Sequence, residues 1–252
     1  MRRVVLLALL VLAAPASAQA PVETPAECRV AEAHVSQAFP LPQTARAISA
    51  KSLDVLVLGA GSSALPGPDG QKKAYPARFK EALSAALPGV AIMLVTDVKS
   101  ARTAEVMLAS LPQDLAKSNP QLVIWQTGTV DALQGADPDR FGDAIEKGVF
   151  LARSTGADVV LMNAQYSPRT ESMINLGAYA EAMRWVAVQH EIPLFDRYAV
   201  MKTWADLGIF DFNVATKKLD MAERVHDCIG RLLADLVLEA VKSEGPQAEG
   251  GR

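Results

Sequence analysis

Two adjacent serines, Ser62 and Ser63, are the residues of this sequence best placed to carry out a nucleophilic reaction. They follow an apolar run at 53–58 and stand in a loop that also contains Gly59 and Gly61. A serine attacks a carbonyl carbon when a base removes its proton and when hydrogen-bond donors stabilise the oxyanion that forms. Serines in such loops also serve as turn and capping residues. Acyl transfer at this loop therefore requires a base and an oxyanion hole elsewhere in the chain.

The sequence has three histidines, His34, His190 and His226, and we predict that none of them is the base. His190 ends a predicted helix, where the helix dipole favours an imidazole. His226 lies next to a core-facing helical stripe that includes Cys228, so we expect it at a flanking or surface position. No pair of histidines has the spacing of metal ligands, and we predict neither a metal nor a cofactor.

Short apolar runs alternate with amphipathic segments along most of the chain. The predicted strands are 53–58, 90–95, 122–126, 158–162 and 193–195. The predicted helices are 75–87, 103–116, 138–155, 176–190, 198–204 and 221–241. Near-continuous Val, Leu and Ile strands separated by helices predict a mostly parallel sheet covered on both faces. The expected fold is a flavodoxin-like α/β fold with three layers, α/β/α.

In a parallel α/β sheet the functional groups lie on loops beyond the carboxyl ends of the strands. The corresponding segments here are 59–69, 96–101, 127–133, 163–170 and 211–221. The residues that we expect to form a binding site on these loops are Gly59, Gly61, Asp97, Gly128, Val130 and Asp131.

Several motifs, in this order and spacing, resemble those of the SGNH (GDSL-type) hydrolases, and more narrowly those of an exported bacterial subgroup. They are Val57-Leu58-Gly59, Tyr75-Pro76-Ala77-Arg78, Asp158-Val159-Val160-Leu161-Met162, Gln165-Tyr166-Ser167-Pro168, Pro193-Leu194-Phe195, Arg197, Met201, Trp204 and Cys228-Ile229-Gly230-Arg231-Leu232-Leu233-Ala234. The resemblance covers about residues 50–240. It implies the fold of that family and an ester-hydrolase site at the carboxyl edge of the sheet, but fold alone does not determine function.

The first catalytic block of the family, Gly-Asp-Ser, is not preserved. If Gly59 is aligned with the family glycine, Ala60 and Gly61 occupy the next two positions and the nucleophile is missing. A shift of two residues gives Gly61-Ser62-Ser63, with Ser63 as the nucleophile.

The three remaining catalytic blocks also depart from the family pattern. The second lacks its glycine and carries Asp97, whose charge would oppose a developing oxyanion. In the third, Val130 replaces an asparagine that donates to the oxyanion, a loss worth about 3 to 4 kcal/mol, while Asp131 is expected to cap the next turn. In the fourth, Lys217 and Asp220 stand where the family has Asp-x-x-His, and a lone aspartate is a poor base for a serine.

The N-terminus has the pattern of a cleavable secretory signal peptide. Arg2 and Arg3 precede the apolar run 4–14 and a small-residue cleavage site, so we expect cleavage near Gln19 and a periplasmic or secreted product without a membrane anchor. The expected organisation is a signal peptide at 1–18, an N-terminal arm at 19–50 with a short helix at 26–39, an SGNH hydrolase-like domain at 51–242 and a disordered tail at 243–252.

The two cysteines, Cys28 and Cys228, are expected to form one long-range disulfide in an oxidising compartment, with two buried thiols as the alternative. Removal of two arginines with the signal peptide takes the formal charge from −3 to −5. A mildly acidic chain without a basic cluster argues against nucleic acid as a partner.

The hypothesis that we favour is an exported pseudoenzyme, an SGNH-like protein with impaired catalysis that binds a small ligand, a glycan or a protein partner. The alternative is an active serine esterase that uses Ser62 or Ser63, together with Asp220, on a small ester or an acetylated glycan. A purely structural or assembly role is a third possibility.

Overall fold

Five parallel strands form one sheet in the order β2-β1-β3-β4-β5 in the computed structural model, which describes residues 24–29, 34–35, 39–213 and 219–243. The strands are β1 (Ser52–Gly59), β2 (Ala91–Val98), β3 (Leu122–Gln126), β4 (Asp158–Met162) and β5 (Leu194–Phe195). The helices are α1 (Ala26–Arg29), α2 (Pro42–Ser49), the 3-10 helix η2 (Gly61–Ser63), α3 (Gly70–Lys73), α4 (Tyr75–Ala86), α5 (Ala104–Ser118), α6 (Thr129–Leu133), α7 (Pro138–Ser154), α8 (Pro168–Glu171), α9 (Leu176–Gln189), α10 (Arg197–Asp206) and α11 (Leu219–Ala240).

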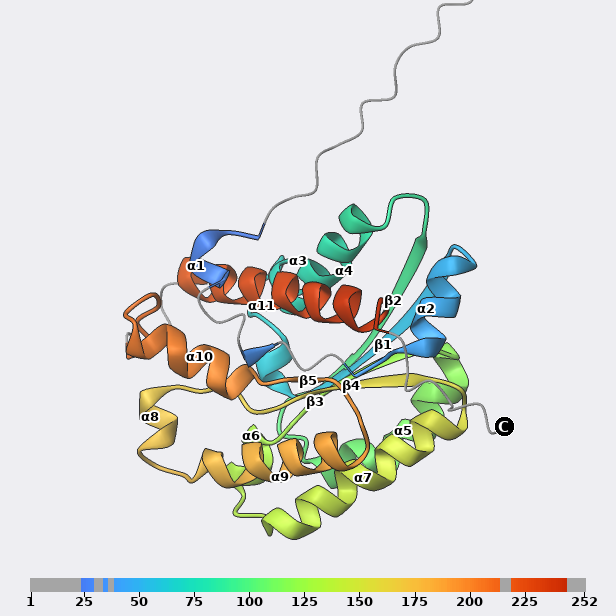
Figure 1. Ribbon diagram of the computed structural model, residues 1–252. Coiled ribbons are helices and arrows are strands. Elements are labelled where there is room, and N and C mark those ends of the chain that lie inside the picture. The colour runs from blue at the N-terminus through green and yellow to red at the C-terminus, as the bar shows by residue number, and fades with distance from the viewer. Residues whose placement is uncertain (1–23, 30–33, 36–38, 214–218, 244–252) are drawn as a thin grey trace, which may run out of the picture.

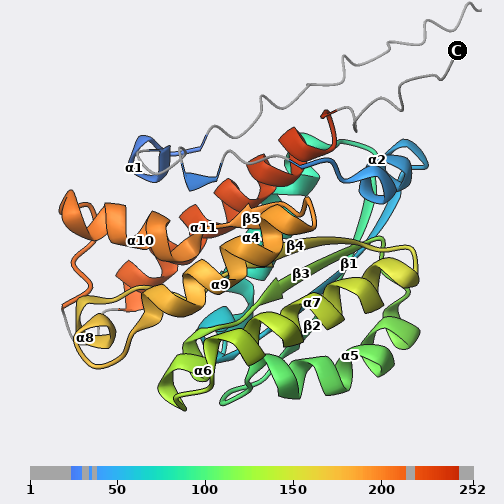
Figure 2. The ribbon, with the colours of Figure 1, turned by 60° about the horizontal axis from the view of Figure 1, so that its bottom comes forward.

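Helices cover both faces of the sheet, so the predicted three-layer α/β/α fold is confirmed. Figure 1 shows α4 and α11 above the sheet and α7 and α9 below it, and Figure 2 shows α5, α7 and α9 side by side over the second face. The central strands β3 and β4 are buried at every residue, which explains their almost entirely apolar sequences. The edge strand β2 is more exposed, with Met93 at 60% and Val95 at 40%.

The two faces of the sheet carry separate hydrophobic cores. Val55 and Val57 of β1 point to the face covered by α4 and α11, while Leu56 and Leu58 point to the face covered by α5 and α7. This alternation follows from the two-residue period of a strand. It assigns each side chain at the carboxyl edge to one face.

Close packing of α7 against the sheet depends on Gly148. A Cβ atom at this position would lie 2.0 Å from Cζ3 of Trp125, whose indole ring is buried on β3. The helix begins at Pro138, where the Asp137 carboxylate accepts from two backbone N–H groups at 3.0 Å.

The N-terminal segment is fastened to α11 and to the sheet. The predicted disulfide between Cys28 and Cys228 is present and joins α1 to α11, with Cα atoms 5.1 Å apart. Of the predicted helix at 26–39, the structure describes α1 at 26–29 and residues 34, 35 and 39, which are not α-helical, and α2 was not predicted. This second helix is held where the backbone N–H of Thr44 donates to Asp158 Oδ2 at 2.7 Å.

Other predictions either differ from the structure or concern residues that it does not describe. The loops predicted at 59–69, 127–133 and 163–170 contain the short helices η2, α6 and most of α8. The proposed signal peptide, residues 19–23, the tail beyond 243 and Lys217 lie outside the described residues. Within the described ranges, no helix is both long enough and apolar enough to cross a membrane.

Candidate functional site

A cavity of about 530 Å³ lies beyond the carboxyl ends of β1 and β3, where a parallel α/β sheet places its functional groups. The loop after β1, helix α6, the segment after β4 and the first turns of α11 contribute to its wall. Its polar lining residues are Ser62, Thr129, Gln165 and His226.

The two candidate serines face different surroundings. Ser63 is 2% exposed, and its Oγ donates to Gln126 Oε1 at 2.7 Å and lies 3.1 Å from the Tyr75 hydroxyl. A Cβ atom at Gly59 would lie 2.4 Å from Ser63 Oγ, so the glycine makes room for this inward orientation. Ser62 instead lines the cavity. A ligand in the cavity would therefore meet Ser62 rather than Ser63, the serine that the alignment with the family favours.

Gln126, the last residue of β3, ties the loop after β1 to the sheet. Its Oε1 accepts from Ser63 Oγ, from Ser62 Oγ at 3.2 Å and from the backbone N–H of Ala60 at 3.3 Å. The Nε2 of Gln126 is buried and has no hydrogen-bond partner among the described residues. Among the described residues, the Ser62 hydroxyl donates to the Gln126 amide oxygen alone, and an amide is too weak a base to remove a serine proton.

Arg197, at the start of α10, places a buried positive charge behind this wall. The residue is 1% exposed, and Nη1 donates to the Ser62 carbonyl oxygen at 3.1 Å and to Ser62 Oγ at 3.4 Å. Nη2 donates to Gln165 Oε1 at 3.3 Å, and the guanidinium carbon lies 5.8 Å from the centre of the Tyr75 ring. Burial lowers the pKa of Arg197 to about 10, so it stays charged at neutral pH.

His226 is buried and lines the cavity, so the expectation of a flanking or surface position was wrong. Its Nδ1 accepts from the backbone N–H of Tyr75 at 2.9 Å, which leaves the proton of the neutral ring on Nε2. Burial and then the nearby Arg197 cation lower the pKa of His226 to about 3. The ring is therefore a neutral hydrogen-bond donor at Nε2 and not a base.

The two remaining histidines bond elsewhere, His34 to Thr203 Oγ1 at 2.8 Å and His190 to Glu146 Oε1 at 2.7 Å. Asp220, the expected replacement for the family base, is exposed on the first turn of α11 and does not line the cavity. Among the described residues, no hydrogen bond joins Asp220 to Ser62 or Ser63.

The loop after β3 contributes part of the cavity wall. Val130 lines the cavity with its apolar side chain, and Gly128 makes the turn with φ at 105°. Asp131 is buried, and its carboxylate accepts from the backbone N–H groups of Ala104 and Gly128 and from the Thr127 hydroxyl. Burial raises the pKa of Asp131, against these bonds. The aspartate therefore fixes the starts of α5 and α6 and is not free to meet a ligand.

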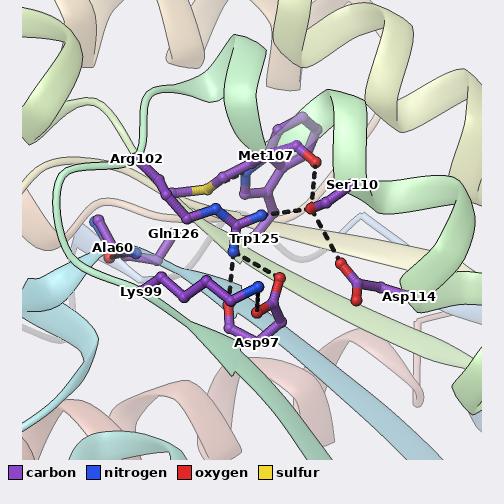
Figure 3. Close-up of polar contacts among 9 residues, drawn as sticks. All are labelled: Ala60, Asp97, Lys99, Arg102, Met107, Ser110, Asp114, Trp125 and Gln126. Carbon is purple, nitrogen blue, oxygen red and sulfur yellow. Dashed lines mark hydrogen bonds and ion pairs between the residues drawn. The ribbon is translucent and has the colours of Figure 1, made fainter.

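Asp97 does not line the cavity. Figure 3 shows the two cations that hold its carboxylate, Lys99 and Arg102. Arg102 Nη1 lies 2.6 Å from Asp97 Oδ2, and Lys99 Nζ lies 2.8 Å from Oδ1. Burial opposes ionisation of Asp97, but Lys99 and Arg102 outweigh it and lower the pKa. Arg102 also donates to Ser110, whose hydroxyl donates to Asp114. The carboxylate of Asp97 is therefore paired with Lys99 and Arg102 and is not part of the cavity lining.

The cavity thus combines donors and a buried positive charge, but nothing in the described residues supplies a general base to Ser62. Within the same residues, no group of three or more His, Cys, Asp or Glu side chains could hold a metal ion. Sequence reasoning missed the roles of Gln126, Arg197 and His226. The sequence offered one signal for Gln126, which is that a polar residue ends an otherwise apolar strand.

The fold and the position of the cavity define an SGNH hydrolase-like protein. The model of the non-GDSL lipase-like family matches residues 27–243, and the chain belongs to that family. A search of curated proteins found no match.

Solved structures with the same fold are hydrolases of low sequence identity. TesA is 24% identical, with 73% of this chain and 99% of that chain covered and a TM-score of 0.58. The psychrotrophic esterase EstA from Pseudoalteromonas sp. is 16% identical, with coverage of 75% and 99% and a TM-score of 0.58. Axe2, an acetylxylan esterase from Geobacillus stearothermophilus, is 17% identical, with coverage of 78% and 97% and a TM-score of 0.57. At these identities the likeness confirms the fold alone.

Proposed function

We propose that this protein is exported and uses the carboxyl-edge cavity to bind a ligand without hydrolysing esters. The observation that carries the proposal is the orientation of His226: its Nδ1 accepts from the Tyr75 backbone, and its Nε2 holds the ring proton. A serine hydrolase needs an imidazole, or an equivalent base, with a free lone pair directed at the serine hydroxyl. Here the one histidine that lines the cavity has no lone pair to offer.

Two further features support impaired catalysis. Val130, which aligns with the oxyanion-binding asparagine of the family, lines the cavity with a side chain that cannot donate a hydrogen bond, and Asp220 is exposed and does not line the cavity. The buried disulfide between α1 and α11 supports export, because such bonds persist in oxidising compartments. N-terminal sequencing of the exported protein tests the second part of the proposal, with a start near Gln19 expected and a start at Met1 contradicting it.

An active esterase remains the second candidate, because the hydroxyl of Ser62 lines the cavity beside a cation. The two functions are separated by the hydrolysis of p-nitrophenyl acetate and p-nitrophenyl butyrate. We expect the purified protein, Ser62→Ala and Ser63→Ala to give the same slow, non-saturating rates. Saturable turnover by the parent protein that is lost in Ser62→Ala would contradict the proposal, provided that thermal unfolding shows both proteins to be folded.

A further inference from the structure

Arg197 carries a buried charge that no described carboxylate neutralises. The side chain is 1% exposed, and the ion pairs of the described residues do not include it. Its Nε atom is buried without a hydrogen-bond partner among those residues. Burial of an ion costs several kcal/mol unless an opposite charge compensates it, and buried arginines are almost always paired. Among the described residues, the guanidinium therefore has no partner anion.

The surroundings of Arg197 direct its charge to the cavity. Its Nη1 and Nη2 atoms hold Ser62 and Gln165, and both of these residues line the cavity wall. The hydroxyl of Ser62 can turn from Gln126 to a ligand, because Ser63 and the backbone of Ala60 still donate to that amide oxygen. The cavity therefore has a polar end with a hydroxyl donor and a cation behind it.

His226 adds a second donor at this end. Its Nε2–H makes no hydrogen bond within the part of the chain that is described, although the ring lines the cavity. Two neutral donors above a buried cation form a surrounding that suits a carboxylate, since bonds to an ionised acceptor are about twice as strong as neutral ones.

Apolar side chains make up much of the remaining cavity wall. Leu65, Pro66, Val130, Leu133 and Leu219 contribute to it, and Leu133 is 58% exposed. A volume of about 530 Å³ is within the range of pockets that hold small organic molecules. An aliphatic chain would cover this wall.

We propose that the cavity binds an aliphatic monocarboxylate, with the carboxylate at Ser62 and His226 in front of Arg197 and the chain along the apolar wall. This inference rests on the proposed function, which is ligand binding without ester hydrolysis. A working esterase would instead release such an acid as its product. The carboxylate supplies a negative charge to compensate the Arg197 cation, and the aliphatic chain covers the exposed surface of Leu133.

The test is isothermal titration of the full mature protein with octanoate and with octanol, its neutral counterpart. We expect octanoate to bind more tightly than octanol. Arg197→Met should weaken octanoate binding by about tenfold or more and leave octanol binding unchanged. Arg140→Met, which removes a charge from the exposed surface of α7, is the matched control and should change neither.

The thermal unfolding of Arg197→Met separates a binding role from a structural one. Arg197→Met removes an unpaired buried charge but also removes the donors to Ser62 and Gln165, so its melting temperature serves as the folding control for the binding comparison. If this variant does not fold, Ser62→Ala provides the same comparison, with a loss of preference for octanoate over octanol expected. Equal affinity of the parent protein for the two ligands, or no binding of octanoate, would overturn the inference.

Incubation with methyl octanoate separates this failure from failure of the proposed function. Release of octanoate, detected by mass spectrometry and lost in Ser62→Ala, would show that the protein is an esterase. Intact methyl ester together with no preference for octanoate would overturn only the carboxylate inference.

Discussion

Acidification should destabilise this protein through His226, and the replacement His226→Asn should remove that part of the pH dependence. In the folded protein the ring is neutral with a pKa of about 3, against an ordinary value of 6.5. Between these values the unfolded chain binds a proton that the folded protein does not bind. The free energy of unfolding contributed by this residue is therefore full above pH 6.5 and falls as the pH falls towards 3.

The size of the effect follows from the shift. Each pH unit between the two pKa values costs about 1.4 kcal/mol, so a descent to pH ~4.5 costs about 3 kcal/mol. Asparagine is a suitable replacement because its Oδ1 can accept from the Tyr75 backbone in place of the imidazole Nδ1. The variant keeps the hydrogen bond and loses the titration.

The assay is urea unfolding of both proteins at pH ~7.5 and ~4.5. We expect the parent protein to lose about 3 kcal/mol more than His226→Asn between the two conditions. Asp131 and Asp158, whose pKa values burial raises, act in the opposite direction, but they act equally in both proteins and cancel in the difference. Equal losses in the two proteins would refute the assignment of His226 as a buried, neutral donor.

Three further predictions concern the fold. Gly148→Ala should destabilise the protein by about 1 to 3 kcal/mol, because its Cβ would overlap a buried indole ring. Gly142→Ala on the same helix has no atom nearer than 4.0 Å to its Cβ and should stabilise the protein by about 0.5 to 1 kcal/mol. Changes of the same sign in the free energies of unfolding of the two variants, measured in urea, would refute the reasoning. Replacement of Cys28 and Cys228 by alanine should cost about 5 kcal/mol for a sequence separation of 200, and a loss below about 1 kcal/mol in the same assay would contradict the chain-entropy estimate. Asp131→Ala should cost about 2 to 3 kcal/mol by leaving three donors without an acceptor, with Asp131→Asn less costly in thermal unfolding; an alanine variant as stable as the parent would contradict this role.

The sheet and the long helices follow from sequence because apolar periodicity determines both. Strands β3 and β4 begin and end at the predicted residues, since their burial on both faces leaves an uninterrupted apolar run. Strand β2 extends to Val98, beyond the predicted end at 95, because it pairs with β1 along its whole length despite its exposed residues. Helix α2 was missed, and one contact that holds it, the bond from the Thr44 backbone to Asp158, joins residues 114 apart in the chain.

The site was less predictable because its properties arise from burial and not from residue type. The sequence predicted which loops lie at the carboxyl edge of the sheet. It also showed that Val130 stands where the family has a hydrogen-bond-donating asparagine. It did not show that Ser63 turns inward, or that Arg197 is buried without an acidic partner among the described residues. The burial of His226 depends on the start of α4, which packs against α11 and is 151 residues away along the chain. Helical periodicity within α11 alone gives no indication of that contact.

The central claim, that no serine of the cavity is activated, is tested most directly by a fluorophosphonate probe and the intact mass of the product. The mature protein, folded and with the Cys28–Cys228 bond intact, is treated with the probe alongside Ser62→Ala and Ser63→Ala. We expect no mass increase in any of the three proteins. A stoichiometric adduct on the parent protein that one of the two alanine variants abolishes would contradict the claim and identify the nucleophile.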